Sequence, residues 1–199
     1  GPSGVLVIDG GSSYAHGLDV LRAIRQTTDR PIRALLLTQA RPEFIFGAKA
    51  FQEAGISVWM HRQASELMRS RCNACLQRLR KTLGPALMQG SELIEPDFVL
   101  SEGLDTPLIG RPLQILVPAA GRGTGELVVW DPGVGVLVGG GLVAHRRIPQ
   151  AIDGQIRGWW QALDELGRLP IVQVIPGHGA PGSSQMLGEQ KAYLQALLD

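Results

Sequence analysis

The sequence has few cysteines, almost no net charge and no long apolar run, and each shortage narrows the range of functions. Two cysteines among 199 residues leave no second pair with which to complete a four-cysteine zinc site. No apolar run reaches the roughly 18 residues that a membrane-spanning helix needs, so we expect no membrane span. The formal net charge of +1 gives no electrostatic reason to expect nucleic acid or an acidic membrane surface as a partner.

Several catalytic signatures are missing as well. The sequence has no Gly-x-Ser-x-Gly segment, no phosphate-binding glycine-rich loop and no Cys-His pair at a known spacing. The three glycines at 139–141 are too few and wrongly flanked for a dinucleotide fingerprint. Serine or cysteine hydrolase chemistry therefore has no support. The first residues also lack the pattern of a signal peptide.

What the sequence does contain is the composition of an ordinary globular protein. Hydrophobic residues make up 44% of the chain and charged residues 19%. Abundant Val, Ile and Leu can offset the entropy of ordering the chain, which argues against disorder. A chain of this length buries one substantial core, so we expect a single domain over residues 1–199.

The first half of the chain alternates between predicted strands and helices. The predicted strands are residues 5–8, 32–38 and 56–60, of which the first two are buried apolar runs. The predicted helices are residues 18–27, 48–54 and 64–83. Serines at 12 and 13 are well placed to cap the first helix. The third presents Leu67, Leu76, Leu79 and Leu83 on one face and arginines on the other, and Gly84-Pro85 ends it.

The second half of the chain is richer in short strands. These strands are predicted at residues 98–100, 113–117, 127–130 and 136–138. Asp131-Pro132-Gly133 predicts a hairpin turn, and the glycines at 139–141 predict a tight turn. A helix at 154–169, a strand at 171–175, a loop at 176–179 and a helix at 184–198 complete the pattern. Strands that alternate with helices indicate a layered α/β protein.

An unusual segment follows the second predicted strand. An apolar run ends in Thr38 and continues with polar residues and an aromatic residue, Phe44. This segment resembles the signature of the metallo-β-lactamase fold family. In that signature an apolar strand ends in Thr and continues as His-x-His-x-Asp-His, a short apolar stretch and Gly. The resemblance assigns the positions of His, His, Asp and His to Gln39, Arg41, Glu43 and Phe44.

The resemblance extends over almost the whole chain. Residues 7–11 are similar to the family's first strand and its turn. Arg122 stands in the segment that usually supplies a third His, and Gly141 stands where the family has a bridging Asp. The Pro-Gly-His-Gly motif around His178 is intact, and His178 is the one ligand position retained. The resemblance implies an αββα sandwich, with two mixed sheets inside and helices outside.

The resemblance also indicates a subgroup of the family and a point in the domain at which the given sequence begins. Three segments of the chain are similar to the matching segments of the bacterial quinoprotein relay system metallohydrolases. They are Cys72 with Cys75, Arg147-Ile148-Pro149, and Asp153-Gly154. That subgroup implies a periplasmic location. Related chains place several strands before this point, which implies that the given sequence begins inside its domain. The alternative is that Gly1-Pro2 is a remnant of expression.

The replaced residues bear on the metal that the resemblance implies. In active members, two zinc ions share a bridging hydroxide, and each ion is held by three protein groups. Arg41 and Arg122 have no lone pair to donate and would place positive charge where a cation should sit. Gly141 offers no side chain. We therefore predict no metal ligands and no catalytic residues at this site, with a single zinc ion bound elsewhere as the alternative.

The same residues suggest a different site. Arginine presents a planar fork suited to carboxylate or phosphate, so these residues could bind an anion. Our candidates for such a ligand-binding site are Gln39, Arg41, Glu43, Arg122 and His178. The alternative, which we favour over the pocket, is an internal salt bridge among Arg41, Glu43 and Arg122.

Three hypotheses for the function follow. The first is a non-catalytic protein of this fold that binds a partner protein or an anionic small molecule. If the subgroup resemblance holds, the partner belongs to a quinoprotein dehydrogenase system. The second is a metal-dependent hydrolase of a thioester, lactam or lactone. The third is a structural subunit whose missing strands come from another chain.

Other residues with chemical potential have ordinary interpretations. Cys72 and Cys75 lie inside the predicted long helix, so a structural disulfide or two ordinary thiols are favoured over redox catalysis. The remaining histidines, His16, His61 and His145, are expected at the surface or beside the site and not as ligands. Two adjacent tryptophans at 159 and 160 cannot both face the core, so we expect one of them to rim a cleft or a partner surface.

Overall fold

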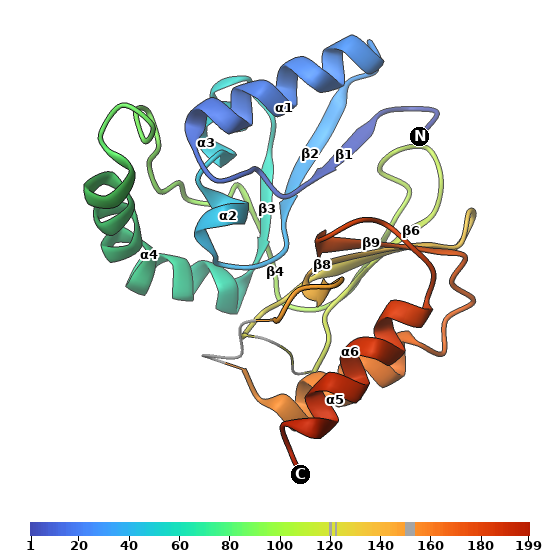
Figure 1. Cartoon of the computed structure of the whole chain (residues 1–199). Coiled ribbons are helices and arrows are strands. Elements are labelled where there is room, and N and C mark those ends of the chain that lie inside the picture. Colours follow the sequence, from blue (N-terminus) through green and yellow to red (C-terminus); the bar gives the residue numbers. More distant parts are fainter. Residues whose placement is uncertain (120, 122, 150–153) are drawn as a thin grey trace. The chain divides into compact units, whose positions relative to one another are not determined.

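The structure is a computed structural model that describes residues 1–119, 121, 123–149 and 154–199 (Figure 1). The chain forms two compact units. Unit 1 comprises residues 1–101 with 108–110, and unit 2 comprises residues 102–107 with 111–199. The single domain expected over residues 1–199 stays a prediction.

Unit 1 contains a parallel sheet with the strand order β1-β2-β3-β4. Its strands are β1 (Val5–Ile8), β2 (Ile32–Leu37), β3 (Val58–His61) and β4 (Phe98–Leu100). Residues 34–37 of the central strand β2 have no exposed surface, which explains their continuous apolar run. We expected β1 to be equally buried, but it is partly exposed because it lies at the end of the described strand order.

Four helices belong to unit 1. They are α1 (Tyr14–Thr27), α2 (Pro42–Ile45), α3 (Ala48–Glu53) and α4 (Arg62–Leu83). Ser13 caps α1 as predicted, because its side chain accepts a hydrogen bond from the backbone N–H of His16 at 3.2 Å. The single turn α2 was not predicted. It begins at a proline, which suits the first position of a helix.

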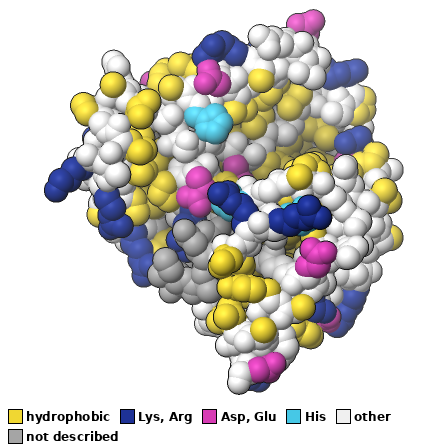
Figure 2. Space-filling model, in the orientation of Figure 1, with side chains coloured by type: hydrophobic (Ala, Val, Ile, Leu, Met, Phe, Trp, Pro, Cys, Tyr) yellow, Lys and Arg dark blue, Asp and Glu magenta, His cyan; other side chains and the backbone are white. Residues whose placement is uncertain are grey.

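Helix α4 buries one face and exposes most of its arginines, as predicted. The buried residues recur at helical spacing from Ala64 to Leu76. Figure 2 shows a row of Lys and Arg side chains along the side of the molecule where Figure 1 draws α4. We expected Leu83 on the apolar face, but it is 49% exposed, because the buried stripe ends at Leu76, about two turns before the helix does.

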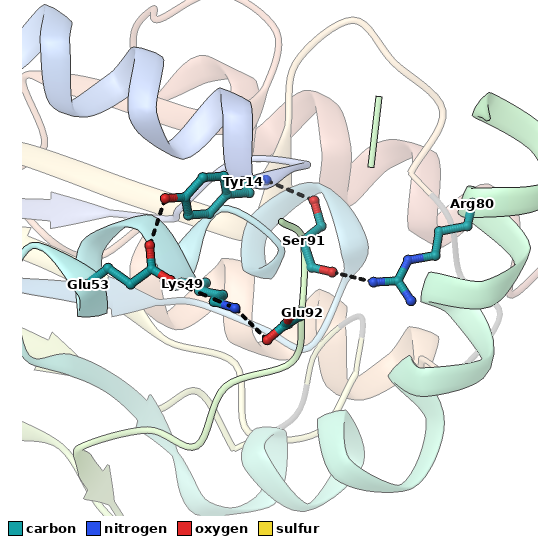
Figure 3. A network of polar contacts seen from close by, with 6 residues as sticks. All are labelled: Tyr14, Lys49, Glu53, Arg80, Ser91 and Glu92. Carbon is teal, nitrogen blue, oxygen red and sulfur yellow. Dashed lines mark hydrogen bonds and ion pairs between the residues drawn. The ribbon is translucent and has the colours of Figure 1, made fainter. Parts of the chain in front are cut away.

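A polar network ties the segment between α4 and β4 to the helices of unit 1 (Figure 3). Its six members are Tyr14, Lys49, Glu53, Arg80, Ser91 and Glu92. Ser91 has no exposed surface, accepts the backbone N–H of Tyr14 at 2.9 Å through its hydroxyl, and offers its carbonyl to Arg80 at 2.9 Å. The Tyr14 hydroxyl donates to Glu53 at 2.6 Å. These contacts hold an irregular segment in place by hydrogen bonds, since no strand or helix fixes it.

Unit 2 contains a mixed sheet with the strand order β5-β6-β7-β8-β9. Its strands are β5 (Leu104–Thr106), β6 (Leu113–Leu116), β7 (Val128–Asp131), β8 (Val136–Ala144) and β9 (Gln173–His178). The strands from β5 to β8 pair antiparallel, whereas β9 pairs parallel with β8. The hairpin turn predicted at residues 131–133 joins β7 to β8 and is confirmed.

Two predictions for this sheet were wrong, and β5 was not predicted. We expected a tight turn at the glycines 139–141, but β8 continues through them to Ala144 with irregular register near Gly140. We expected a loop from Pro176, but β9 continues to His178. In both places the ladder between β8 and β9 holds the backbone extended despite residues that usually end strands.

In the described part of unit 2, the helices α5 (Ile156–Leu166) and α6 (Gln185–Ala196) pack against each other. Trp159 has no exposed surface, and its indole N–H donates to the carbonyl of Leu142 at 2.9 Å. One inward-facing tryptophan was predicted. Trp160 is partly buried and lies beneath Lys191, whose Nζ is 4.4 Å from the ring centre, so α6 and not an open cleft borders it. Over the described ranges, no helix is both long and apolar enough to cross a bilayer.

Candidate functional site

The loop after β2, residues 38–47, is anchored at its start by Asp9. The Asp9 carboxylate accepts the backbone N–H of Thr38 at 2.8 Å and the Thr38 hydroxyl at 2.9 and 3.0 Å. Asp9 has a φ of 65°, a left-handed conformation that costs free energy for a residue other than glycine. These contacts join two parts of unit 1 that are 29 residues apart. The strained backbone of Asp9 thus coincides with the contact that fixes the loop.

The far end of the same loop is anchored to the same turn. The backbone N–H of Gly10 donates to the carbonyl of Phe44 at 2.7 Å, and that of Gly47 donates to the carbonyl of Gly11 at 3.0 Å. A Cβ atom on Gly47 would lie 1.9 Å from the carbonyl oxygen of Gly10. The backbone segments therefore touch here, and the loop is a rigid part of unit 1.

Gln39 is the most deeply buried polar candidate on this loop. Its exposed fraction is 3%, and among the described residues its Nε2 has no hydrogen-bond partner. A buried donor without a partner costs about 1–3 kcal/mol. The amide N–H groups of Gln39 therefore favour any acceptor that can reach them.

Arg41 and Glu43 lie beside Gln39 and are both partly buried. Arg41 has extended backbone before α2, and its carbonyl accepts the backbone N–H of Phe44 at 3.0 Å. Glu43 lies in the first turn of α2, and its negative charge adds to the larger effect of burial in raising the pKa of Asp9. Phe44 faces inward and is 4% exposed, so it contributes packing and no chemistry.

Asp9 makes the stability of unit 1 depend on pH. Burial raises the pKa of Asp9 from 3.8 to about 7, although hydrogen bonds from Thr38 lower it. The folded state then holds this proton more tightly than the unfolded state, so the stabilisation is present below pH 4 and is lost as the pH rises through about 7. We expect the free energy of unfolding to fall by at most about 2 kcal/mol between pH 5 and 7.

Urea denaturation at pH 5, 6 and 7 measures this loss. The variant Asp9→Asn has no titrating group at this position and should lose the pH dependence. Parallel pH profiles for the parent and the variant would contradict the assignment to Asp9.

His178 belongs to unit 2, where it ends β9 and is partly buried. Its carbonyl accepts the backbone N–H of His145 at 2.8 Å. The flanking glycines approach β8 closely: a Cβ on Gly177 would lie 2.3 Å from the carbonyl oxygen of Gly140, and one on Gly179 would lie 2.3 Å from that of His145. The intact motif around His178 therefore has a packing reason in this fold.

The five predicted site residues thus have different outcomes. Gln39, Arg41 and Glu43 lie together on one loop of unit 1, and His178 lies in unit 2. Arg122 lies outside the described residues. The role of Asp9 was not predicted, although an Asp directly after an apolar strand, followed by two glycines, is a visible signal in the sequence.

The donor set of loop 38–47 does not fit zinc. Zinc binds imidazole, thiolate or carboxylate groups that converge at about 2 Å. The loop supplies an amide, a guanidinium and a single carboxylate, from Gln39, Arg41 and Glu43. In the described parts of the chain, no three His, Cys, Asp or Glu side chains gather in a way that could hold a metal ion.

The cysteines and the other histidines have structural contacts. Cys72 and Cys75 are free thiols, so the disulfide alternative is wrong. Burial raises the pKa of the Cys72 thiol to about 12, and its Sγ donates to the carbonyl of Ala40 at 3.8 Å. A thiol with so high a pKa is a poor nucleophile at neutral pH. His61 accepts the backbone N–H of Gln63 at 3.2 Å and caps α4.

A family model described as the metallo-beta-lactamase superfamily matches residues 1–178. The chain belongs to this superfamily. Among solved structures, it is similar to a metallo-beta-lactamase from Pontibacter korlensis, with 21% identity, a TM-score of 0.82, and coverage of 98% of this chain and 83% of that one. It is also similar to the FIM-1 enzyme of Pseudomonas aeruginosa in its mono-zinc form, with 17% identity, a TM-score of 0.80, and coverage of 99% and 81%. The mixed α/β fold with two sheets is confirmed.

Two curated relatives of this superfamily member carry enzyme names. A linear primary-alkylsulfatase from Pseudomonas sp. (strain ATCC 19151) is 26% identical over 220 residues, which is 92% of this chain and 41% of the relative. The type 2 metallo-beta-lactamase from Bacteroides fragilis is 27% identical over 109 residues, 52% of this chain and 44% of the relative. The chain therefore spans less than half the length of these relatives. The quinoprotein subgroup and the periplasmic location stay predictions.

Proposed function

We propose that this superfamily member is non-catalytic and binds a small anion, a di- or tricarboxylate, at the loop that in zinc enzymes carries metal ligands. The buried Nε2 of Gln39 is the observation that supports the proposal best. It is a donor held in a rigid loop, two residues before a guanidinium, and an anion is the ligand that uses both.

Electrostatics favours an anion over a divalent cation at this loop. The guanidinium of Arg41 keeps its positive charge and offers five N–H donors and no acceptor. A carboxylate oxygen can accept from it and from the Gln39 amide, whereas a zinc ion would be repelled by it. Glu43 supplies one opposing charge, which limits the net attraction and suits a weakly held metabolite.

The subgroup resemblance extends the proposal to partner and location. A quinoprotein dehydrogenase system in the periplasm is the proposed setting, and a partner protein is the alternative occupant of the site. Whatever activity the whole protein has is also a matter of proposal, because the chain covers only 41% and 44% of the lengths of its two curated relatives.

A metal-dependent hydrolase is the second candidate, and the enzyme names of both curated relatives favour it. Metal content separates the two candidates. For protein purified without chelators we expect zinc well below one equivalent by elemental analysis, and no hydrolysis of a chromogenic lactam above the buffer rate. About two equivalents of zinc together with turnover would overturn the non-catalytic proposal.

Calorimetric titration with succinate and citrate tests the anion site. We expect dissociation constants of about 1 mM or below, and a loss of about tenfold in affinity for Arg41→Ala. Gln39→Met keeps the side-chain length, removes the buried donor and should raise stability by about 1 kcal/mol while weakening binding. Arg157→Ala, which removes an exposed arginine of α5, is the matched control. No heat up to millimolar concentrations would leave the internal salt bridge as the better explanation of Arg41 and Glu43.

A further inference from the structure

Unit 2 contains a cavity of its own, between the segment after β8 and helix α6. Its volume is about 250 Å³. One wall is formed by residues 146–149 and the other by α6, through Met186, Glu189, Gln190 and Tyr193. None of the loop residues 38–47 contributes to it. The cavity thus shares no described lining residue with that loop.

Two adjacent arginines dominate the charge of this cavity. Arg146 and Arg147 are both exposed, and neither makes a hydrogen bond or an ion pair with any residue that the structure describes. Glu189 is the only acidic residue on the described lining. Over the described lining, two positive charges and one negative charge leave a net charge of +1, which matches a monoanion better than a dianion.

The backbone at Arg146 is strained. Its φ of 53° lies in the left-handed region, where residues other than glycine are uncommon. Arg146 and Asp9 are the only described residues other than glycine with such a φ, and Asp9 anchors the loop of the first site. Strain of this kind persists where the surrounding structure fixes it, and it concentrates at ligand-binding positions. Here it directs two consecutive guanidinium groups to one cavity.

The back of the cavity is rigid. The Gln190 side chain is 5% exposed, accepts the backbone N–H of Ala144 at 2.9 Å and donates to the carbonyl of Leu142 at 2.9 Å. These bonds satisfy its amide and fix α6 against the end of β8. The α6 wall of the cavity is therefore held in place before a ligand binds, which lowers the entropic cost of binding there.

Apolar groups complete the lining. Ile148 is 80% exposed, and Pro149, Met186 and the Tyr193 ring border the same space. An exposed isoleucine beside two guanidinium groups is poorly solvated on its own and gains from contact with an apolar chain. The lining therefore combines an anion receptor with a short apolar surface.

We propose that this cavity binds an organic monoanion, a carboxylate or a sulfate ester, that carries a short apolar chain. Arg146 and Arg147 hold the anionic head, because a guanidinium fork accepts two oxygens in one plane. The apolar chain lies against Ile148 and Met186. The volume limits the ligand to a small molecule.

Titration of ¹⁵N-labelled full chain with sodium hexanoate, followed by amide NMR shifts, tests the proposal. We expect a dissociation constant on the order of 1 mM, with shifts at residues 144–149 and 186–193. Hexyl sulfate should bind alike, while inorganic sulfate and 1-hexanol, which each lack one half of the ligand, should bind at least about tenfold more weakly. The double variant Arg146→Ala with Arg147→Ala should lose about tenfold in affinity or more.

Controls separate this cavity from the rest of the molecule. The double variant Arg78→Ala with Arg157→Ala removes two exposed arginines of α4 and α5 and should bind hexanoate like the parent. Arg146→Gly accepts the same φ without strain, so it should keep the melting temperature of the parent and still lose affinity. Hexanoate binding that survives loss of Arg146 and Arg147, equal binding of hexanol, or no shift up to about 20 mM would each overturn the proposal. Shifts confined to residues 38–47, abolished by Arg41→Ala, would assign the ligand to the other site and also overturn it.

Discussion

Replacing Gly47 with alanine is expected to cost about 3 kcal/mol of folding free energy or more, a large share of the stability of an ordinary protein. The added Cβ would lie 1.9 Å from the carbonyl oxygen of Gly10, and that oxygen belongs to the backbone and cannot rotate away. Gly47 has a φ of −85°, which any residue adopts, so the whole cost comes from the close approach. Urea denaturation followed by circular dichroism measures it.

Gly188→Ala is the matched control for this prediction. Gly188 lies inside α6, and a Cβ there meets no atom within 4 Å. Alanine should stabilise the helix by about 0.5–1 kcal/mol, because glycine is a poor residue in a helix interior. A loss of less than about 1 kcal/mol in Gly47→Ala would contradict the close contact between loop 38–47 and the turn at residues 9–11.

Replacing Trp159 with alanine is expected to cost about 3–5 kcal/mol in unit 2. Trp159 is the largest fully buried side chain, and its removal leaves a cavity in the core that α5 and α6 share with the sheet. The indole N–H also donates to the carbonyl of Leu142. Differential scanning calorimetry should show a clear fall in the melting temperature.

Two further variants divide this cost into its parts. Trp159→Phe keeps most of the apolar volume and removes the hydrogen bond, but Gln190 still donates to Leu142, so a loss of about 1–2 kcal/mol is expected. Trp160→Ala removes a partly buried ring whose main polar neighbour is Lys191, and should cost about 1 kcal/mol or less. A larger loss for Trp160 than for Trp159 would reverse our assignment of the inward-facing ring.

The sequence predicted most helices and strands because their patterns are local. Apolar runs marked β2, and helical spacing of apolar residues marked α1 and α4. The errors lie where tertiary contacts override local preference. Pairing with β9 extends β8 through three glycines, and a turn as short as α2 has too few residues to show a period.

The candidate site, like the fold, could be predicted only in part from the sequence. The residue types at Gln39, Arg41 and Glu43 could be read directly from the sequence, and with them the poor fit to zinc. That Nε2 of Gln39 has no partner among the described residues could not be predicted, because hydrogen bonding depends on which groups surround a buried atom. The same holds for Asp9, whose contact with Thr38 spans 29 residues of the chain.

By itself, the sequence determined the order of elements, the family resemblance and the side chains at the positions where that resemblance expects metal ligands. Periodicity and side-chain chemistry are properties of neighbouring residues, so they can be read along the chain. Only the tertiary structure decided that Asp9 anchors the loop after β2, that Gly47 touches Gly10, and that Arg146 and Arg147 share a cavity with α6. Those facts are distances between segments far apart in sequence, and packing sets such distances.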